Sequence, residues 1–219
     1  MTGNDTASAV ELDGNTGGWA DPSALGLAPL AGINLAFAGD FLGWWGPDAA
    51  PLIAVIGFVG GILQLLTGVL FVRRGDAAGG TLMGAFGMLF MWAPGFMLVA
   101  NEVGLVSGLN PFFGTWSLFL GLLLGMWSIA LLRKPWFEFL IGPLGFLALG
   151  SAGFHDLGLL PAFVPGIGFL SLLAWGLYML THALAATVGL SVPLGRPAID
   201  IFVDGDGTDA RAPQASHGD

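Results

Sequence analysis

The stretch that decides the fold is Ala49–Arg74, AAPLIAVIGFVGGILQLLTGVLFVRR, in which an uncharged run from residue 49 to 72 ends at two arginines. A helix that crosses a bilayer needs about 20 consecutive apolar residues, so this run is long enough. Further uncharged runs cover residues 77–101, 103–132 and 157–195. We therefore predict an all-α, polytopic membrane protein with six transmembrane helices in a bundle, at 23–45, 51–72, 79–100, 112–132, 137–154 and 165–189.

The composition of the chain supports a membrane protein. The 219 residues are 55% hydrophobic and 10% charged, whereas a soluble domain has about 25% charged residues. The flanking segments are rich in Gly, Asp, Ser and Thr and have little to bury. We predict a six-helix transmembrane domain at residues 21–195, a disordered tail at 1–20 and an acidic tail at 196–219.

Lysine and arginine are restricted to alternate connections between the expected helices. Cytoplasmic loops of membrane proteins are enriched in Lys and Arg, so this pattern also sets the orientation. We predict a multi-pass protein of the plasma membrane with both termini in the cytoplasm. The six basic residues follow the second, fourth and sixth expected helices in pairs, as Arg73 and Arg74, Arg133 and Lys134, and Arg196 and Arg211.

Charge, cysteine content and motifs exclude several functions. The net charge of −9 argues against a nucleic-acid partner, and the absence of Cys excludes thiolate metal sites and Cys nucleophiles. No motif of a hydrolase, metalloprotease or nucleotide-binding enzyme is present, and the three His (His155, His182 and His217) are far apart. We predict that the protein is not an enzyme and needs no cofactor or metal.

Polar residues within the expected helices are mostly neutral. Such groups connect helices by hydrogen bonds or line a path for a small polar or weakly acidic solute, and without a fixed countercharge they suit a strong ion poorly. Asp40 lies near the external end of the first helix, either as a vestibule group or merely exposed. The neutral groups are Asn34, Gln64, Thr67, Thr81, Thr115, Tyr178 and Thr181.

Small residues four positions apart recur along the expected helices. Gly makes up 37 residues of the chain, and three pairs have the GxxxG spacing that lets helix backbones approach closely in lipid. This frequency predicts a tightly packed bundle that forms oligomers. The pairs are Gly39 and Gly43, Gly80 and Gly84, and Gly121 and Gly125.

Two segments carry a resemblance to a known family. The opening of the first helix, DPSALGL at residues 21–27, resembles the NPAPLGL signature of the acetate uptake transporter family, also called succinate–acetate permeases. The segment GGILQLLTG at residues 60–68 is similar to that family's GGxxQxxxG segment. The resemblance continues to residue 195 in the family's order, although Asp replaces the first Asn and Ala24 the second Pro. The motif positions retained or conservatively changed are Asp21, Pro22, Leu25, Gly26 and Leu27.

The resemblance implies a hexamer in which each protomer conducts acetate and similar small monocarboxylates, sometimes succinate, as a channel or by symport. Family members have a narrow ring of Phe, Tyr and Leu in the pore, and the corresponding positions are Leu30, Met88 and Leu144. We expect these three residues to form the constriction. The residues expected to contact the solute are Asn34, Gln64, Trp92, Tyr178 and Thr181.

Two other functions remain open at this point. A channel for small neutral solutes such as urea, amides or water would also use six helices and an apolar constriction. A membrane sensor or scaffold would use the acidic tails as docking segments. Deletion of residues 1–18 and 200–219 would separate the last hypothesis from transport, because transport should survive it.

Overall fold

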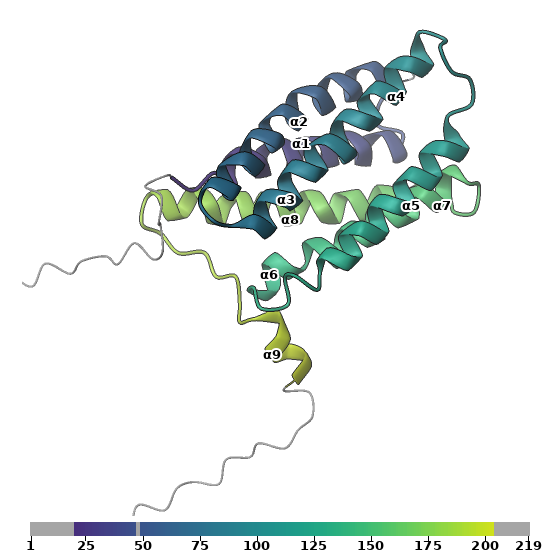
Figure 1. The fold of residues 1–219 in the computed structure, drawn as a ribbon. Helices are drawn as coiled ribbons and strands as arrows, with labels where there is room; N and C mark the ends of the chain where they lie inside the picture. The colour runs from purple at the N-terminus through teal and green to yellow at the C-terminus, as the bar shows by residue number, and fades with distance from the viewer. Residues whose placement is uncertain (1–19, 47–48, 204–219) are drawn as a thin grey trace, which may run out of the picture.

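The computed structural model describes residues 20–46 and 49–203, so the expected tail at 1–20 and most of the acidic tail at 196–219 lie outside the described residues. All named elements of the described part are helices, and they form one bundle of roughly parallel and antiparallel helices (Figure 1). An all-α membrane bundle is therefore confirmed. The elements are α1 (Ser23–Phe41), α2 (Ala49–Arg73), α3 (Ala77–Phe86), the π-helix η1 (Gly87–Trp92), α4 (Ala93–Glu102), α5 (Asn110–Trp127), α6 (Trp136–Phe139), α7 (Ile141–Asp156), α8 (Phe163–Thr187) and α9 (Ala198–Val203).

Five continuous helical segments of the described chain are long and apolar enough to cross a membrane. They are Ser23–Phe41, Ala49–Arg73, Ala77–Glu102, Trp136–Asp156 and Phe163–Thr187. The remaining expected span, at 112–132, corresponds to α5, which is shorter, with 18 residues. Backbone N–H groups from Ile129 to Leu132 continue it by bonds to carbonyls three residues earlier, so the α5 segment reaches the expected boundary at 132 in a tighter form. The described chain thus has five helices long enough to cross a membrane and a shorter apolar helix at the position of the remaining expected span.

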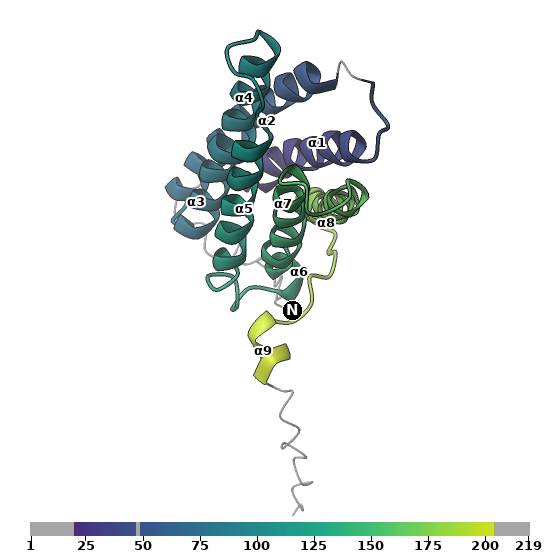
Figure 2. The same cartoon turned by 90° about the vertical axis from the view of Figure 1, so that its right-hand side faces the viewer.

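The helices form a ring of neighbours around the centre of the bundle. In order, α5 packs on α7, α7 on α8, α8 on α1, α1 on α2, and α2 on the continuous α3–η1–α4 segment. The indole N–H of Trp116 in α5 donates to the Leu89 carbonyl in η1 at 3.0 Å, which closes the ring. Figure 2 shows α1 and α8 on one side and α3 and α5 on the other. Residues from all these helices therefore face a shared interior.

Glycine allows the closest helix contacts. A Cβ atom built on Gly68 of α2 would lie 2.6 Å from the backbone N of Gly84 in α3, and one on Gly121 of α5 would lie 2.9 Å from the backbone N of Gly150 in α7. Only glycine fits such contacts without a backbone shift. A Cβ on Gly32 of α1 would meet nothing within 4 Å, so glycine at that position has no such role.

The segment Ala77–Glu102 changes its helical period in the middle. Pro94 has no N–H to donate to the preceding turn, and its ring disfavours the regular i to i−4 pattern. The six residues Gly87–Trp92 immediately before it form a π-helix. A π-helix rotates the residues that follow it relative to a regular α-helix, so the face of α4 cannot be assigned by extending the period of α3.

All basic residues of the described chain lie at one end of the bundle. Arg73 and Arg74 end α2, Arg133 and Lys134 lie in the turn before α6, and Arg196 pairs with that turn through its carbonyl, which accepts the Trp136 N–H at 2.9 Å. Further backbone bonds join Leu194 to Phe137 and Ala198 to Lys134. The first residues of the expected C-terminal tail are thus bound to the turn before α6, with α9 beyond it (Figure 1).

Candidate functional site

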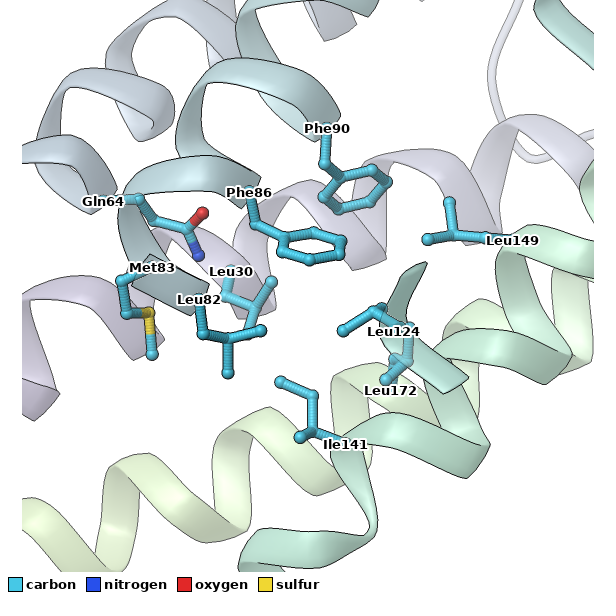
Figure 3. A pocket seen from close by; sticks show the side chains of 10 residues that line it. All are labelled: Leu30, Gln64, Leu82, Met83, Phe86, Phe90, Leu124, Ile141, Leu149 and Leu172. Atoms are coloured by element: carbon cyan, nitrogen blue, oxygen red, sulfur yellow. The ribbon is translucent and has the colours of Figure 1, made fainter. Parts of the chain in front are cut away.

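A small cavity lies at the centre of the helix ring. Its volume of about 20 Å³ is room for about one water molecule. Its walls come from α1, α2, α3, η1, α5, α7 and α8, and are apolar except for one amide (Figure 3). The lining residues of this central cavity are Leu30, Gln64, Leu82, Met83, Phe86, Phe90, Leu124, Ile141, Leu149 and Leu172.

Gln64 supplies the polar group of the central cavity. Its side chain is 1% exposed and extends from α2 toward Leu30 and Phe86 (Figure 3). Nε2 donates a long hydrogen bond of 3.4 Å to the Gly26 carbonyl of α1, whereas Oε1 is buried without a partner. Buried polar atoms are paired in the great majority of cases, so an unpaired carbonyl oxygen here is a candidate contact for a solute.

A larger pocket of about 450 Å³ adjoins the central cavity at the basic end of the bundle. Leu82, Met83 and Ile141 line both spaces. We call it the Asp21 pocket; its charged and titratable residues are Asp21, Asp76, Lys134, Glu138 and His182. Three of these acids have partners: Asp21 pairs with Arg74 at 3.3 Å, Glu138 with Lys134 at 3.9 Å, and Asp76 accepts the Gly79 N–H at 2.8 Å.

A second pocket, of about 380 Å³, lies at the opposite end. We call it the Asp40 pocket; its polar residues are Asp40, Asn101, His155 and Asp156. His155 Nδ1 is 2.8 Å from the Leu160 carbonyl, and Oδ2 of Asp156 is buried without a partner. The pocket has two carboxylates and no Lys or Arg, because the basic residues of the described chain are at the other end.

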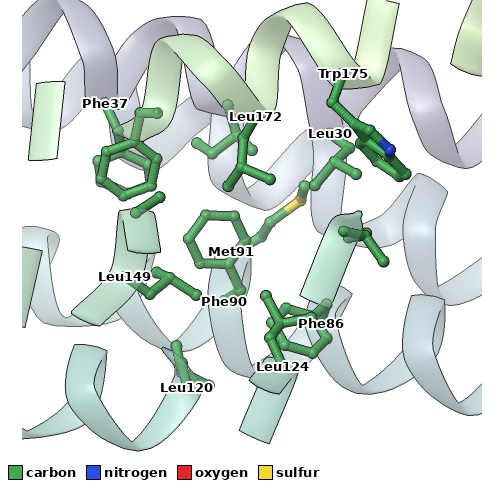
Figure 4. Packing of buried hydrophobic residues seen from close by; sticks show 14 of the residues in the cluster. Leu30, Phe37, Phe86, Phe90, Met91, Leu120, Leu124, Leu149, Leu172 and Trp175 are labelled. Atoms are coloured by element: carbon green, nitrogen blue, oxygen red, sulfur yellow. The ribbon is translucent and has the colours of Figure 1, made fainter. Parts of the chain in front are cut away.

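Stacked phenyl rings separate the Asp40 pocket from the central cavity. Phe37 lines the pocket and Phe90 lines the cavity, with their ring centroids 5.7 Å apart. Phe169 of α8 lies against both, at 5.3 Å from Phe37 and 6.5 Å from Phe90, and Phe41 stacks on it at 5.7 Å. Figure 4 shows Phe37, Phe90 and Leu149 in the surrounding apolar packing. We call Phe37, Phe41, Phe90 and Phe169 the phenyl stack.

The three residues expected to form the constriction do not come together. Leu30 lines the central cavity and is 7% exposed. Met88 is 37% exposed on the outside of the bundle, and Leu144 packs half-buried against the core without lining the cavity. Phe86 and Phe90 are four apart and share the inward face of this segment, whereas Met88 lies midway between them in sequence and faces outward. In α7 the cavity is lined by Ile141 and Leu149 instead.

The five residues expected to contact the solute do not come together either. Gln64 lines the central cavity, and Asn34 is fully buried, with Nδ2 donating to the Leu30 carbonyl at 2.7 Å and Oδ1 unpaired. The three others donate to backbone carbonyls. Trp92 Nε1 donates to Phe58 of α2 at 3.0 Å, Thr181 Oγ1 to Leu177 within α8 at 2.8 Å, and the Tyr178 hydroxyl to Pro193 after α8. None of these three lines the central cavity or the pockets at its two ends.

The motif at the start of α1 has a structural role at the Asp21 pocket. Asp21 Oδ1 accepts the Ser23 N–H at 2.8 Å, so it caps the helix start before Pro22, which is buried. Leu27 lines the Asp21 pocket, and a Cβ on Gly26 would lie 2.9 Å from Thr67 of α2. Leu25 is half-buried. The motif therefore fixes α1 against α2 beside the pocket.

The phenyl stack was not predicted from the sequence. Its only sequence signal is spacing: Phe37 and Phe41, and Phe86 and Phe90, are each four apart and so share a helix face. Seventeen phenylalanines occur in the chain, and this spacing does not separate pore-lining rings from lipid-facing ones.

Comparisons with known proteins bear on the fold. No protein-family model matches the sequence, and no curated protein matches it. Among solved structures, the chain is similar to the bacterial acetate channel SatP, with a TM-score of 0.72 and 19% sequence identity over 81% of this chain and 99% of that one. The chain therefore has the fold of an acetate channel, which is consistent with the resemblance of residues 21–195 to the acetate uptake transporter family.

Proposed function

We propose that the protein is a membrane channel or carrier for acetate and similar small monocarboxylates. The observation that carries the proposal is a central apolar cavity, with one polar residue, aligned between two polar pockets at opposite ends of a membrane bundle. A small solute can enter either pocket in its hydrated form and must lose water only at the phenyl stack and the central cavity. The fold shared with SatP supports the same function.

The constriction in this proposal consists of Leu30 and Phe86 beside the phenyl stack. A central volume of about 20 Å³ is smaller than any organic acid, so passage requires side-chain movement. Small acids need less movement than succinate, and we propose acetate, formate and propionate as preferred solutes. The proposal also includes symport, assembly as a hexamer, and an orientation in the plasma membrane with the Asp21 pocket in the cytoplasm. The resemblance and the basic turns at that end support these parts.

The decisive experiment is uptake of labelled acetate into proteoliposomes, with protein-free liposomes as the baseline, with and without an imposed pH gradient. Formate, propionate, succinate and urea serve as competitors. Protein-dependent acetate uptake supports the proposal, and uptake equal to the protein-free baseline contradicts it.

A pair of variants tests the proposed path. Leu30→Trp adds a large ring to the central cavity and should abolish protein-dependent uptake. Met88→Trp places the same ring on the outside of the bundle, where the side chain is already 37% exposed, and should leave uptake unchanged. Normal uptake by an inserted Leu30→Trp protein would remove Leu30 from the path.

A channel for small neutral solutes is a second candidate. The lining of the central cavity contains no cationic side chain, and the Asp40 pocket has two carboxylates, both of which favour an uncharged solute. Liposome swelling in urea and in acetate over a pH series would separate the two functions.

A further inference from the structure

The side-chain amide of Gln64 presents an unpaired acceptor, Oε1, in the central cavity. Gln64 Nε2 faces the Gly26 carbonyl, so rotating the amide by half a turn would bring two carbonyl oxygens together. The orientation is therefore fixed, and Oε1 is left as a buried acceptor without a donor. A solute that satisfies it must bring an O–H or N–H group.

The charges of the two pockets at the ends of the path also disfavour an anion. At the Asp40 pocket a solute meets Asp40 and Asp156, with His155 as the nearest group that could balance them. At the Asp21 pocket Asp21, Asp76 and Glu138 are offset by Arg74, Lys134 and His182. An anion is repelled at one end and gains little at the other, and the only donor it meets in the cavity is the second N–H of Gln64 Nε2.

We propose that Gln64 is the selectivity residue of the path and selects, through Oε1, for uncharged solutes that carry a hydrogen-bond donor. This inference rests on the proposed function and deepens it. The permeating species is then the undissociated carboxylic acid rather than its anion, and primary amides of similar size share the path. A carboxylate has only acceptor atoms and leaves Oε1 unpaired at the narrowest point.

A merely structural role for Gln64 is the competing explanation, because its Nε2 joins α2 to α1. Thr67 provides the matched control. It lies one turn further along α2, is fully buried, and packs on Gly26 of α1, but it does not line the central cavity. Thr67→Val keeps the packing on Gly26 and removes the hydrogen bond from Thr67 Oγ1 to the Leu63 carbonyl, so it tests the loss of a buried polar group beside α1 outside the cavity. Gln64→Met keeps the size of the side chain and removes both the acceptor Oε1 and the donor Nε2.

The test compares two competitors of labelled acetate uptake in proteoliposomes. Acetamide and acetone have almost the same shape, but only acetamide has N–H donors. Competition is used because acetone crosses lipid unaided. A single neutral hydrogen bond corresponds to a preference of about two- to tenfold. We expect acetamide to compete better than acetone by this factor in the wild type and in Thr67→Val, and equally in Gln64→Met.

Equal competition by acetone and acetamide in the wild type would overturn the proposal, and this comparison holds even if Gln64→Met fails to fold. A preference for acetamide that persists in a folded Gln64→Met protein would also overturn it. A second readout is charge movement: wild-type acetate uptake should not change when a membrane potential is imposed with potassium and valinomycin, and a potential-dependent uptake would contradict permeation of the neutral acid.

The two proposals fail in different ways. Acetate uptake that depends on the protein but also on the potential refutes the selectivity of Gln64 and leaves the proposed function intact. Absence of protein-dependent acetate uptake refutes the proposed function. In that case liposome swelling in acetamide decides the inference: swelling that Gln64→Met abolishes supports it, and no swelling overturns it.

Discussion

The two ends of the path differ in how they manage charge. At the Asp21 pocket each carboxylate has a cation or a backbone N–H beside it, and the segment from Leu190 to Val203 passes close by, with Leu194 in the pocket wall. At the Asp40 pocket, Asp40 and Asp156 have no Lys or Arg, and the phenyl stack lies directly behind them. One end is balanced in charge and is separated from the cavity only by apolar side chains that line both spaces, whereas the other is acidic and is separated from it by stacked rings.

This difference indicates where the barrier to a solute lies. From the Asp21 pocket a solute reaches the central cavity past Leu82, Met83 and Ile141, which line both spaces. From the Asp40 pocket it must first displace stacked rings. The predictions below therefore target the Asp40 end first and the Asp21 end last.

The largest effect is expected from Phe169→Ala. Phe169 is 2% exposed and touches Phe37, Phe41 and Phe90, so its removal leaves a large hole in the phenyl stack. Truncation of a buried Phe costs about 3–5 kcal/mol of stability. We expect a lower melting temperature and faster swelling in urea and acetate, measured on purified protein and proteoliposomes.

The control for this variant is Phe163→Ala, on the same helix but 57% exposed. It should change neither the melting temperature nor the swelling rate. A Phe169→Ala protein that remains folded with an unchanged permeability would show that the phenyl stack is not the barrier.

The next effect concerns the charge of the Asp40 pocket. Asp40→Asn with Asp156→Asn keeps the shape and removes both carboxylates, so anions should enter this end several-fold faster at low salt, with a smaller gain at high salt. The measurement is acetate flux at alkaline pH that responds to an imposed potential, which the wild type should lack and this variant should gain. Glu102→Gln removes an exposed acid that does not line the pocket, and an equal gain there would show that only the overall charge matters.

The fold was predictable because its signals are local. Long apolar runs, prolines at helix starts and basic residues in alternate turns gave all six helical segments, and the described boundaries differ by a few residues. The first residues of the C-terminal tail were not predicted, because their binding to the turn at Lys134 uses only backbone groups, for example the bond from the Ala198 N–H to the Lys134 carbonyl.

The site was predictable only in part. Gln64 and Leu30 could be placed because each lies within one continuous α-helix, α2 and α1. Met88 could not, because it was named from its correspondence with the family's ring, whereas the inward face of its helix belongs to Phe86 and Phe90, which are four residues apart. Tyr178 and Thr181 were read as solute contacts from their polarity, yet their hydroxyls donate to carbonyls at Pro193 and Leu177.

A smaller effect is expected from Tyr178→Phe at the Asp21 end. The lost hydrogen bond frees the Pro193 carbonyl, while His182 Nδ1 still lies 2.7 Å from the neighbouring Val192 carbonyl. One hydrogen bond is worth about 0.5–1.5 kcal/mol, so the segment around Leu194 should exchange its amide hydrogens faster with little change in overall stability. Hydrogen exchange followed by mass spectrometry measures this; unchanged exchange at residues 190–198 would show that the hydroxyl does not hold the segment.

The smallest effect is expected from Arg74→Ala, which makes the Asp21 end resemble the Asp40 end. Asp21 is 62% exposed, and an exposed ion pair contributes about 0–1 kcal/mol, so stability should change little. The carboxylate of Asp21 would then lack its cation. In the background of Asp40→Asn with Asp156→Asn, where acetate flux should respond to the potential, entry of acetate from this end should fall slightly, most clearly at low salt. Arg74→Lys keeps the charge and should restore entry. Since Asp21 also caps α1 through the Ser23 N–H, a large loss of stability in Arg74→Ala would mean that the ion pair holds the helix start rather than setting the charge of the pocket.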